Sequence, residues 1–126
     1  MTRPSSLLEV VGRARDSRSF HFELADFLDE FRRLRRFEML VEEPPRLGER
    51  YAGGEVADAY VAAVAVSLAR EIGAVPPRWA RDDSRKLRHP WFAHPGAALR
   101  ATLLAESPAP FRERNLFVSE NALSRA

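Results

Sequence analysis

The sequence contains no cysteine, and Lys86 is its only lysine. Without cysteine, disulfides, thiolate catalysis and thiolate-held zinc or iron–sulfur centres are excluded. Arginine supplies the other strongly basic side chains, and its use together with abundant alanine is typical of a GC-rich bacterial genome. Richness in arginine is therefore weak support for binding to nucleic acid.

Long hydrophobic runs are also absent. The most apolar stretch, residues 56–72, is interrupted by charged side chains, so it does not fit a membrane span. The N-terminal residues contain no apolar run of signal-peptide length. We therefore expect a cytoplasmic protein. Its 126 residues, 45% hydrophobic and 30% charged, are typical of one folded globular domain.

Hydrophobic periodicity predicts two long helices. Over residues 20–34, phenylalanine and leucine recur every three or four positions, and acidic residues precede arginines in the order that suits a helix dipole. Ser17 or Ser19 is the expected N-cap. From near Glu55 to Ile72, small alanines flank a second apolar stripe. Because small side chains allow close packing, this segment is the predicted central helix.

Shorter elements are expected around these two helices. Apolar positions continue to Val41, either in the same bent helix or in a second short one, until Pro44 ends the pattern. A helical turn is predicted near residues 78–87. It is followed by a loop in which Trp91 and Phe92 pack back into the core.

The C-terminal third contains one further predicted helix, over residues 97–106, with Leu99, Leu103 and Leu104 on its apolar side. Residues 116–118 favour a β-strand. No second strand is predicted, so this triplet has nothing to pair with.

These patterns predict an all-α fold, a small single-domain helical bundle of about four to five helices with a structured loop rich in aromatic residues and proline. Residues 20–126 form the predicted domain. Residues 1–19 are mostly polar, and we expect them to form a loosely ordered N-terminal arm.

No residue pattern indicates an enzyme. The three histidines, His21, His89 and His94, lack the spacing that places two metal ligands on one helical face. The sequence contains neither a Gly-x-Ser-x-Gly elbow nor a glycine-rich phosphate loop. We therefore expect a non-enzymatic protein with no catalytic residue, no metal site and no cofactor.

Nucleic-acid binding is the alternative function. A cluster of basic residues is interleaved with Trp79, as in proteins that contact phosphates and stack bases, but Asp82 and Asp83 offset part of its charge. No helix-turn-helix pattern accompanies it. The candidate residues for this alternative are Arg78, Arg81, Arg85, Lys86 and Arg88.

Protein binding is the favoured function. Tryptophan and arginine are the residues that most often anchor protein interfaces, and several aromatic residues lie in or beside irregular segments. The same aromatic residues could instead close the core of a small domain. The sequence leaves both interpretations open.

Several short motifs occur in a characteristic order, namely Asp58–Tyr60, Pro77–Trp79, Pro90–Phe92, Glu106–Pro108 and Phe111–Val118. This order resembles a group of small, uncharacterised proteins from GC-rich bacteria. Some of that group are predicted antitoxins or are fused to DNA-binding domains, and they are similar to genes that accompany nucleotidyltransferase-like toxins. The present sequence lacks the helix-turn-helix of the fused versions.

The resemblance implies a non-enzymatic, antitoxin-like partner that neutralises or regulates another bacterial protein by burying its active site or substrate groove. The partner would be a nucleotidyltransferase-like toxin, with self-association as the other possibility. The expected partner-binding residues are Trp79, Trp91, Phe92, Arg112, Arg114 and Phe117.

Overall fold

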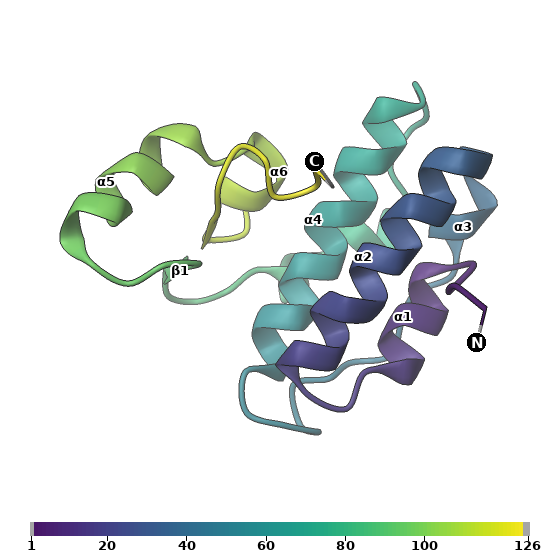
Figure 1. The fold of residues 1–126 in the computed structure, drawn as a ribbon, viewed down its shortest axis with the longest axis horizontal. Helices are drawn as coiled ribbons and strands as arrows, with labels where there is room; N and C mark the ends of the chain where they lie inside the picture. Colours follow the sequence, from purple (N-terminus) through teal and green to yellow (C-terminus); the bar gives the residue numbers. More distant parts are fainter. Residues whose placement is uncertain (1, 125–126) are drawn as a thin grey trace.

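The computed structural model describes residues 2–124 and shows a mostly helical protein (Figure 1). The predicted all-α fold class is confirmed, since six α-helices account for most of the regular structure over these residues. The elements in chain order are α1 (Leu7–Arg13), α2 (Ser17–Leu34), α3 (Glu38–Val41), α4 (Gly54–Glu71), the 3-10 turns η1 (Arg78–Arg81) and η2 (Asp83–Arg85), β1 (Trp91–Phe92), α5 (Ala97–Glu106), α6 (Ala109–Arg112) and β2 (Leu116–Phe117).

Helix α4 is the central helix. It contacts α2, α6, β2 and both 3-10 turns, and most of its side chains are buried (Figure 1). Its buried residues are mainly alanine and valine, which let neighbouring elements approach closely. The predicted helix from near Glu55 to Ile72 is therefore confirmed to within one residue at each end.

Helix α2 begins with a reciprocal cap. The Asp16 carboxylate accepts a hydrogen bond from the Ser19 N–H at 2.8 Å, and the Ser19 hydroxyl accepts one from the Asp16 N–H at 3.1 Å. The predicted N-cap was wrong, because Ser17 is the first helical residue and Ser19 is the partner of the cap. Arg35 follows in the left-handed conformation (φ 53°) and ends the helix, so α3 is a separate short helix.

The N-terminal segment differs from the expected loose arm. Leu7, Val10 and Val11 are at most 1% exposed, and α1 packs against α2. Arg13 at the end of α1 forms an ion pair with Glu23 of α2 at 3.5 Å. Three apolar side chains spaced three and four apart are enough to anchor this short helix, because α2 presents an apolar stripe beside them.

The strand predicted over residues 116–118 is present as β2, but the prediction that it has nothing to pair with was wrong. β2 pairs in parallel with β1, with Trp91 opposite Leu116 and Phe92 opposite Phe117. The Trp91 N–H donates to the Asn115 carbonyl at 2.9 Å. Each strand is only two residues long, so neither shows the alternation from which strands are normally predicted.

Candidate interaction surface

Trp79, a predicted partner-binding residue, belongs to the core instead. Its side chain is 9% exposed, and the indole Nε1–H donates to the Leu40 carbonyl at 3.0 Å. The Arg85 guanidinium lies 4.9 Å from the centre of its ring. With its polar atom satisfied and its face covered, Trp79 joins η1 to α3 and is not available to a partner.

Arg114 and Phe117 are also buried, so their predicted partner-binding role is corrected. The Arg114 guanidinium donates to the Pro110 carbonyl at 2.7 Å and to the Ala80 carbonyl at 2.6 Å. It therefore ties α6 to η1. Phe117 is 8% exposed and stacks on Phe92 with ring centres 5.1 Å apart.

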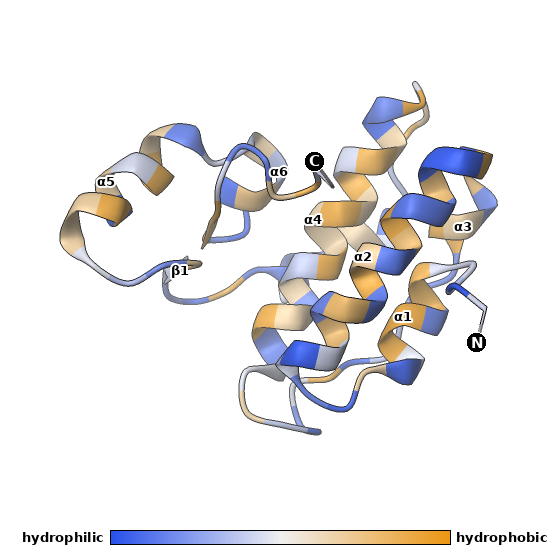
Figure 2. Ribbon diagram, in the orientation of Figure 1, coloured by the Kyte–Doolittle hydropathy of each residue, from blue (hydrophilic) through white to orange (hydrophobic). Residues whose placement is uncertain are grey.

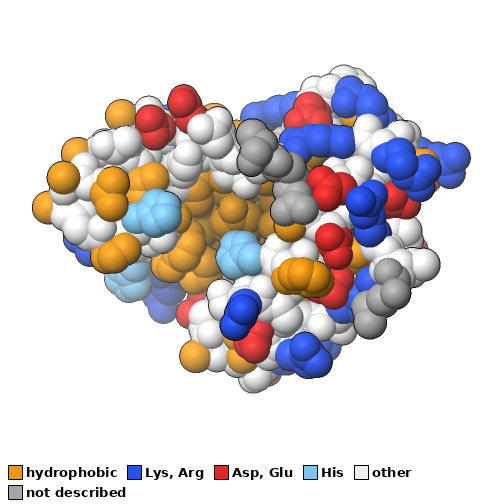
Figure 3. Space-filling view, in the orientation of Figure 1, with side chains coloured by type: hydrophobic (Ala, Val, Ile, Leu, Met, Phe, Trp, Pro, Cys, Tyr) orange, Lys and Arg blue, Asp and Glu red, His pale blue; other side chains and the backbone are white. Residues whose placement is uncertain are grey.

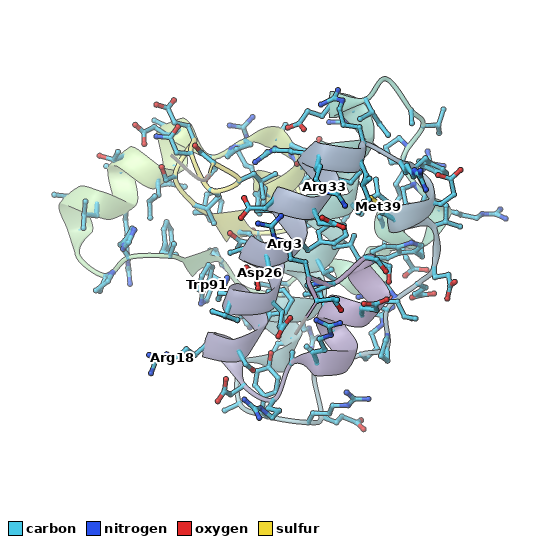
Figure 4. All side chains as sticks on the ribbon, turned by 45° about the vertical axis from the view of Figure 1, so that its right-hand side comes forward. Arg3, Arg18, Asp26, Arg33, Met39 and Trp91 are labelled. Atoms are coloured by element: carbon cyan, nitrogen blue, oxygen red, sulfur yellow. The ribbon has the colours of Figure 1, made fainter. Side chains whose placement is uncertain are left out.

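The other three predicted partner-binding residues reach the surface. Arg112 is exposed, and its guanidinium donates to the Ser107 carbonyl at 3.2 Å. Trp91 and Phe92 are half-buried on β1, and Trp91 packs against the core as the sequence predicts. Trp91, labelled in Figure 4, lines a pocket together with Glu55 and Val56 at the start of α4. The structure thus keeps half of the predicted set accessible.

Arg85, the middle member of the predicted basic segment, is completely buried. Its guanidinium donates to the Pro44 carbonyl at 2.7 Å, to the Asp58 carbonyl at 3.2 Å and to the Glu43 carboxylate at 3.1 Å. Burial lowers the pKa of Arg85, while the hydrogen bond that Arg85 donates to the Glu43 carboxylate opposes this shift. Arg85 is therefore a structural residue, and its assignment to phosphate binding is corrected.

The rest of the basic segment is exposed, namely Arg78, Arg81, Lys86 and Arg88. Two carboxylates, those of Asp82 and Asp83, lie within this segment. Asp83 forms an ion pair with Lys86 at 3.1 Å, and Asp82 accepts from the Ser84 N–H at 2.8 Å. Without Arg85 and with two acidic side chains among the remaining cations, this segment is a weak site for phosphates.

Helix α5 carries an unusual amount of exposed apolar surface. Leu103 is its only buried residue at 3% exposure, whereas Leu99 and Leu104 are 50% and 49% exposed. The main contact of α5 is with β2, and Figures 1 and 2 show this largely hydrophobic helix standing away from the other helices. The sequence places all three leucines on the apolar side of this helix, but only Leu103 is buried in the fold.

A hollow lies beside α5. Figure 3 shows it between α5 and α4, with hydrophobic side chains on its floor and histidine side chains at its edge. On α4, Tyr60 makes edge-on ring contacts with His21 at 5.1 Å and with Phe111 at 5.0 Å. We call the exposed apolar side chains of α5 together with this hollow the α5 surface.

Burial perturbs both polar rings of this aromatic group. Desolvation lowers the pKa of His21, which favours the neutral imidazole, and raises the pKa of Tyr60 to about 12. Both shifts favour the neutral form of the ring.

The raised pKa of Tyr60 predicts how stability depends on alkaline pH. The unfolded chain loses the phenolic proton near pH 10, while the folded protein keeps it until about pH 12. Between these values the unfolded state binds fewer protons, so stability falls as pH rises. Tyrosinate absorbance of the Tyr51→Phe variant, which retains Tyr60 alone, should show a midpoint about 2 units above that of the unfolded chain. A midpoint near 10 in the folded variant would contradict the buried position of Tyr60.

Comparisons with other proteins do not assign the site. No protein family, curated protein or solved structure matches the chain. The resemblance stated from the motifs therefore stays a prediction. Over residues 2–124, no three histidine or carboxylate side chains are grouped so as to hold a metal ion, and no helix has the length and apolar character to cross a membrane.

Sequence reasoning missed Leu99 and Leu104 as surface residues. A signal was present, because seven of the ten residues of α5 are alanine or leucine. A helix that is apolar on every side is normally enclosed, whereas proline and glycine before α5 and proline after it place this one at the end of short connections. The composition indicated an apolar helix but did not indicate how few elements pack against it.

Proposed function

We propose that the chain is a non-enzymatic protein-binding module that acts through the α5 surface. The observation that carries this proposal is the exposure of Leu99 and Leu104 on a helix with a single buried residue. Figure 3 shows hydrophobic side chains gathered over α5, and large exposed apolar patches mark interaction sites. Contact with a partner would remove this area from water, at roughly 25 cal/mol per Å² of apolar surface.

The charges on α5 favour a protein partner over nucleic acid. Arg100 and Glu106 are its only charged residues, and they offset each other. Arg100 also lies over the Phe92 ring, with the guanidinium carbon 5.1 Å from the ring centre. A surface without excess positive charge gives no electrostatic attraction to a phosphate backbone.

The more specific proposal is a neutralising or regulatory partner of another bacterial protein, in the manner of an antitoxin. Its support is the resemblance of the sequence motifs, together with an apolar surface able to cover a groove. Co-expression with the protein of the adjacent gene tests it by bacterial growth. Rescue of growth would support neutralisation, and a neighbour that is harmless when expressed alone would contradict it.

The double substitution Leu99→Asp and Leu104→Asp is expected to weaken partner binding at least about 30-fold, the effect of removing a hot spot. Both side chains are half exposed, so the free energy of unfolding should change by less than about 1 kcal/mol. Affinity is measured by titration calorimetry with the protein of the adjacent gene. A photo-reactive residue at position 104 should form a crosslink to the same protein.

Val75→Asp is the matched control. Val75 is 72% exposed and lies after α4, outside the α5 surface. This variant should bind as the unmodified chain does, and a photo-reactive residue at position 75 should not form the crosslink. Equal loss of affinity in the control, or full affinity in the double variant, would overturn the assignment of the binding surface.

A further inference from the structure

We propose that the corner between α1 and α2 is a second binding site, which takes a linear acidic segment of a protein with an apolar side chain among its carboxylates. A pocket of about 570 Å³ lies there, lined by Arg13, Arg15, Asp16, Arg18, Phe22 and Glu23 among others. This volume is in the range of ligand-binding pockets. The corner lies across the molecule from α5 (Figure 1), so the site is additional to the proposed function.

Phe22 provides the apolar part of this site. Its side chain is 65% exposed, although phenylalanine is usually buried. Arg18 precedes it by four residues on α2, which places the two side chains on the same face of the helix. A ring flanked by a guanidinium fits an apolar side chain that is followed or preceded by a carboxylate.

Arg15 and Arg18 provide the charge. Within residues 2–124 no carboxylate lies at ion-pair distance from either guanidinium, and Figure 4 shows Arg18 extending from α2 into solvent. Both residues are exposed. Hydrogen bonds from Ser19 lower the pKa of the nearby Asp16 carboxylate, and the charges of both arginines lower it further. Neither arginine is held in an ion pair within the described part of the chain, so each guanidinium can form one with a carboxylate of a bound segment.

Arg13 has a different role, as a fixed wall of the pocket. Its guanidinium pairs with Glu9 at 3.2 Å and with Glu23 at 3.5 Å, and it donates to the Thr2 carbonyl at 2.8 Å. These contacts neutralise Arg13 and Glu23 together. The remaining charged side chains of the lining are Arg15, Arg18 and Asp16, so the pocket has a net excess of one positive charge.

The α2 N-terminus is not the anion site, because the Asp16 carboxylate already accepts from the Ser19 N–H. Asp16 and Glu23 also line the pocket, so a bound chain must keep its negative charges close to Arg15 and Arg18 and away from these two carboxylates. Two free arginines fit a short segment with isolated carboxylates better than a backbone charged at every nucleotide.

Fluorescence anisotropy with a labelled synthetic peptide tests the site. The peptide contains one leucine with two aspartates on each side, and the control peptide has asparagine in place of aspartate. The full chain should bind the acidic peptide with an affinity that falls as salt rises. The combined Arg15→Ala and Arg18→Ala substitutions should weaken binding about 10-fold or more, and Phe22→Ala about 5-fold or more.

Arg81→Ala and Val75→Ala are the matched controls, because each removes an exposed side chain of the same kind elsewhere. Both should keep the affinity of the unmodified chain. Absence of binding at millimolar peptide, equal binding of the asparagine peptide, or unchanged affinity in the Arg15 and Arg18 double variant would each overturn the proposal. Tighter binding of a single-stranded oligonucleotide that depends on the same residues would also overturn it, in favour of nucleic acid.

Discussion

Gly54→Ala is expected to lower the free energy of unfolding by about 3 kcal/mol or more. A Cβ atom at position 54 would lie 1.9 Å from the Leu47 carbonyl oxygen and 2.9 Å from the Gly48 nitrogen. The backbone of residues 47 and 48 cannot easily move, because the Asp58 carboxylate accepts hydrogen bonds from the Leu47 N–H at 2.7 Å and from the Gly48 N–H at 3.0 Å. Urea unfolding followed by circular dichroism measures the effect.

Gly12→Ala is the matched control, and its expected effect has the opposite sign. Gly12 lies within α1, and an added Cβ would meet no atom within 4 Å. Alanine stabilises a helix interior relative to glycine by about 0.5 to 1 kcal/mol. Equal effects of the two substitutions would show that the close approach of residues 47 and 48 to α4 does not hold in solution.

The long helices could be predicted because their local pattern and their packing agree. In α2, Phe20, Phe27 and Phe31 repeat at helical spacing and are at most 1% exposed. In α4, alanine combines high helix propensity with the small size that a central position needs. Each residue in these helices satisfies the local and the global requirement at once.

The buried arginines could not be predicted, because local sequence gives no sign of their direction. Arg81 and Arg85 lie in the same polar segment, yet Arg81 is exposed and Arg85 is completely buried. The difference arises from the carbonyls of Pro44 and Asp58, which reach Arg85 from distant parts of the chain. Arg114 is similar, since its partner Ala80 precedes it by 34 residues.

The α5 surface could not be predicted, because the sequence does not show which apolar side chains stay uncovered. Periodicity identifies which side of a helix is apolar but not whether another element lies against it. In α5 only Leu103 is buried, and the main contact of the helix is with the two-residue strand β2. Two of the six predicted partner-binding residues, Trp79 and Arg114, instead hold η1 against α3 and α6. A tryptophan and an arginine, the residue types that most often anchor protein interfaces, therefore stabilise the fold itself in this protein.

Arg85→Met is expected to lower the free energy of unfolding by about 3 kcal/mol or more. Methionine retains much of the side-chain volume but leaves the carbonyls of Pro44 and Asp58 without this donor. An unsatisfied buried carbonyl costs about 1 to 3 kcal/mol. Loss of the guanidinium over the Trp79 ring adds about 0.5 to 2 kcal/mol. Urea unfolding followed by circular dichroism measures the change.

Two further variants separate the sources of this effect. Arg81→Met removes an exposed arginine of the same segment and should change stability by less than about 0.5 kcal/mol. Glu43→Gln should cost less than about 1 kcal/mol, because the Glu43 side chain is 49% exposed and water can replace the ion pair. A stable Arg85→Met protein would show that Arg85 is not needed inside the fold. Arg85 of the unmodified chain would then again be a candidate for phosphate binding. The alternative function in nucleic-acid binding would regain support.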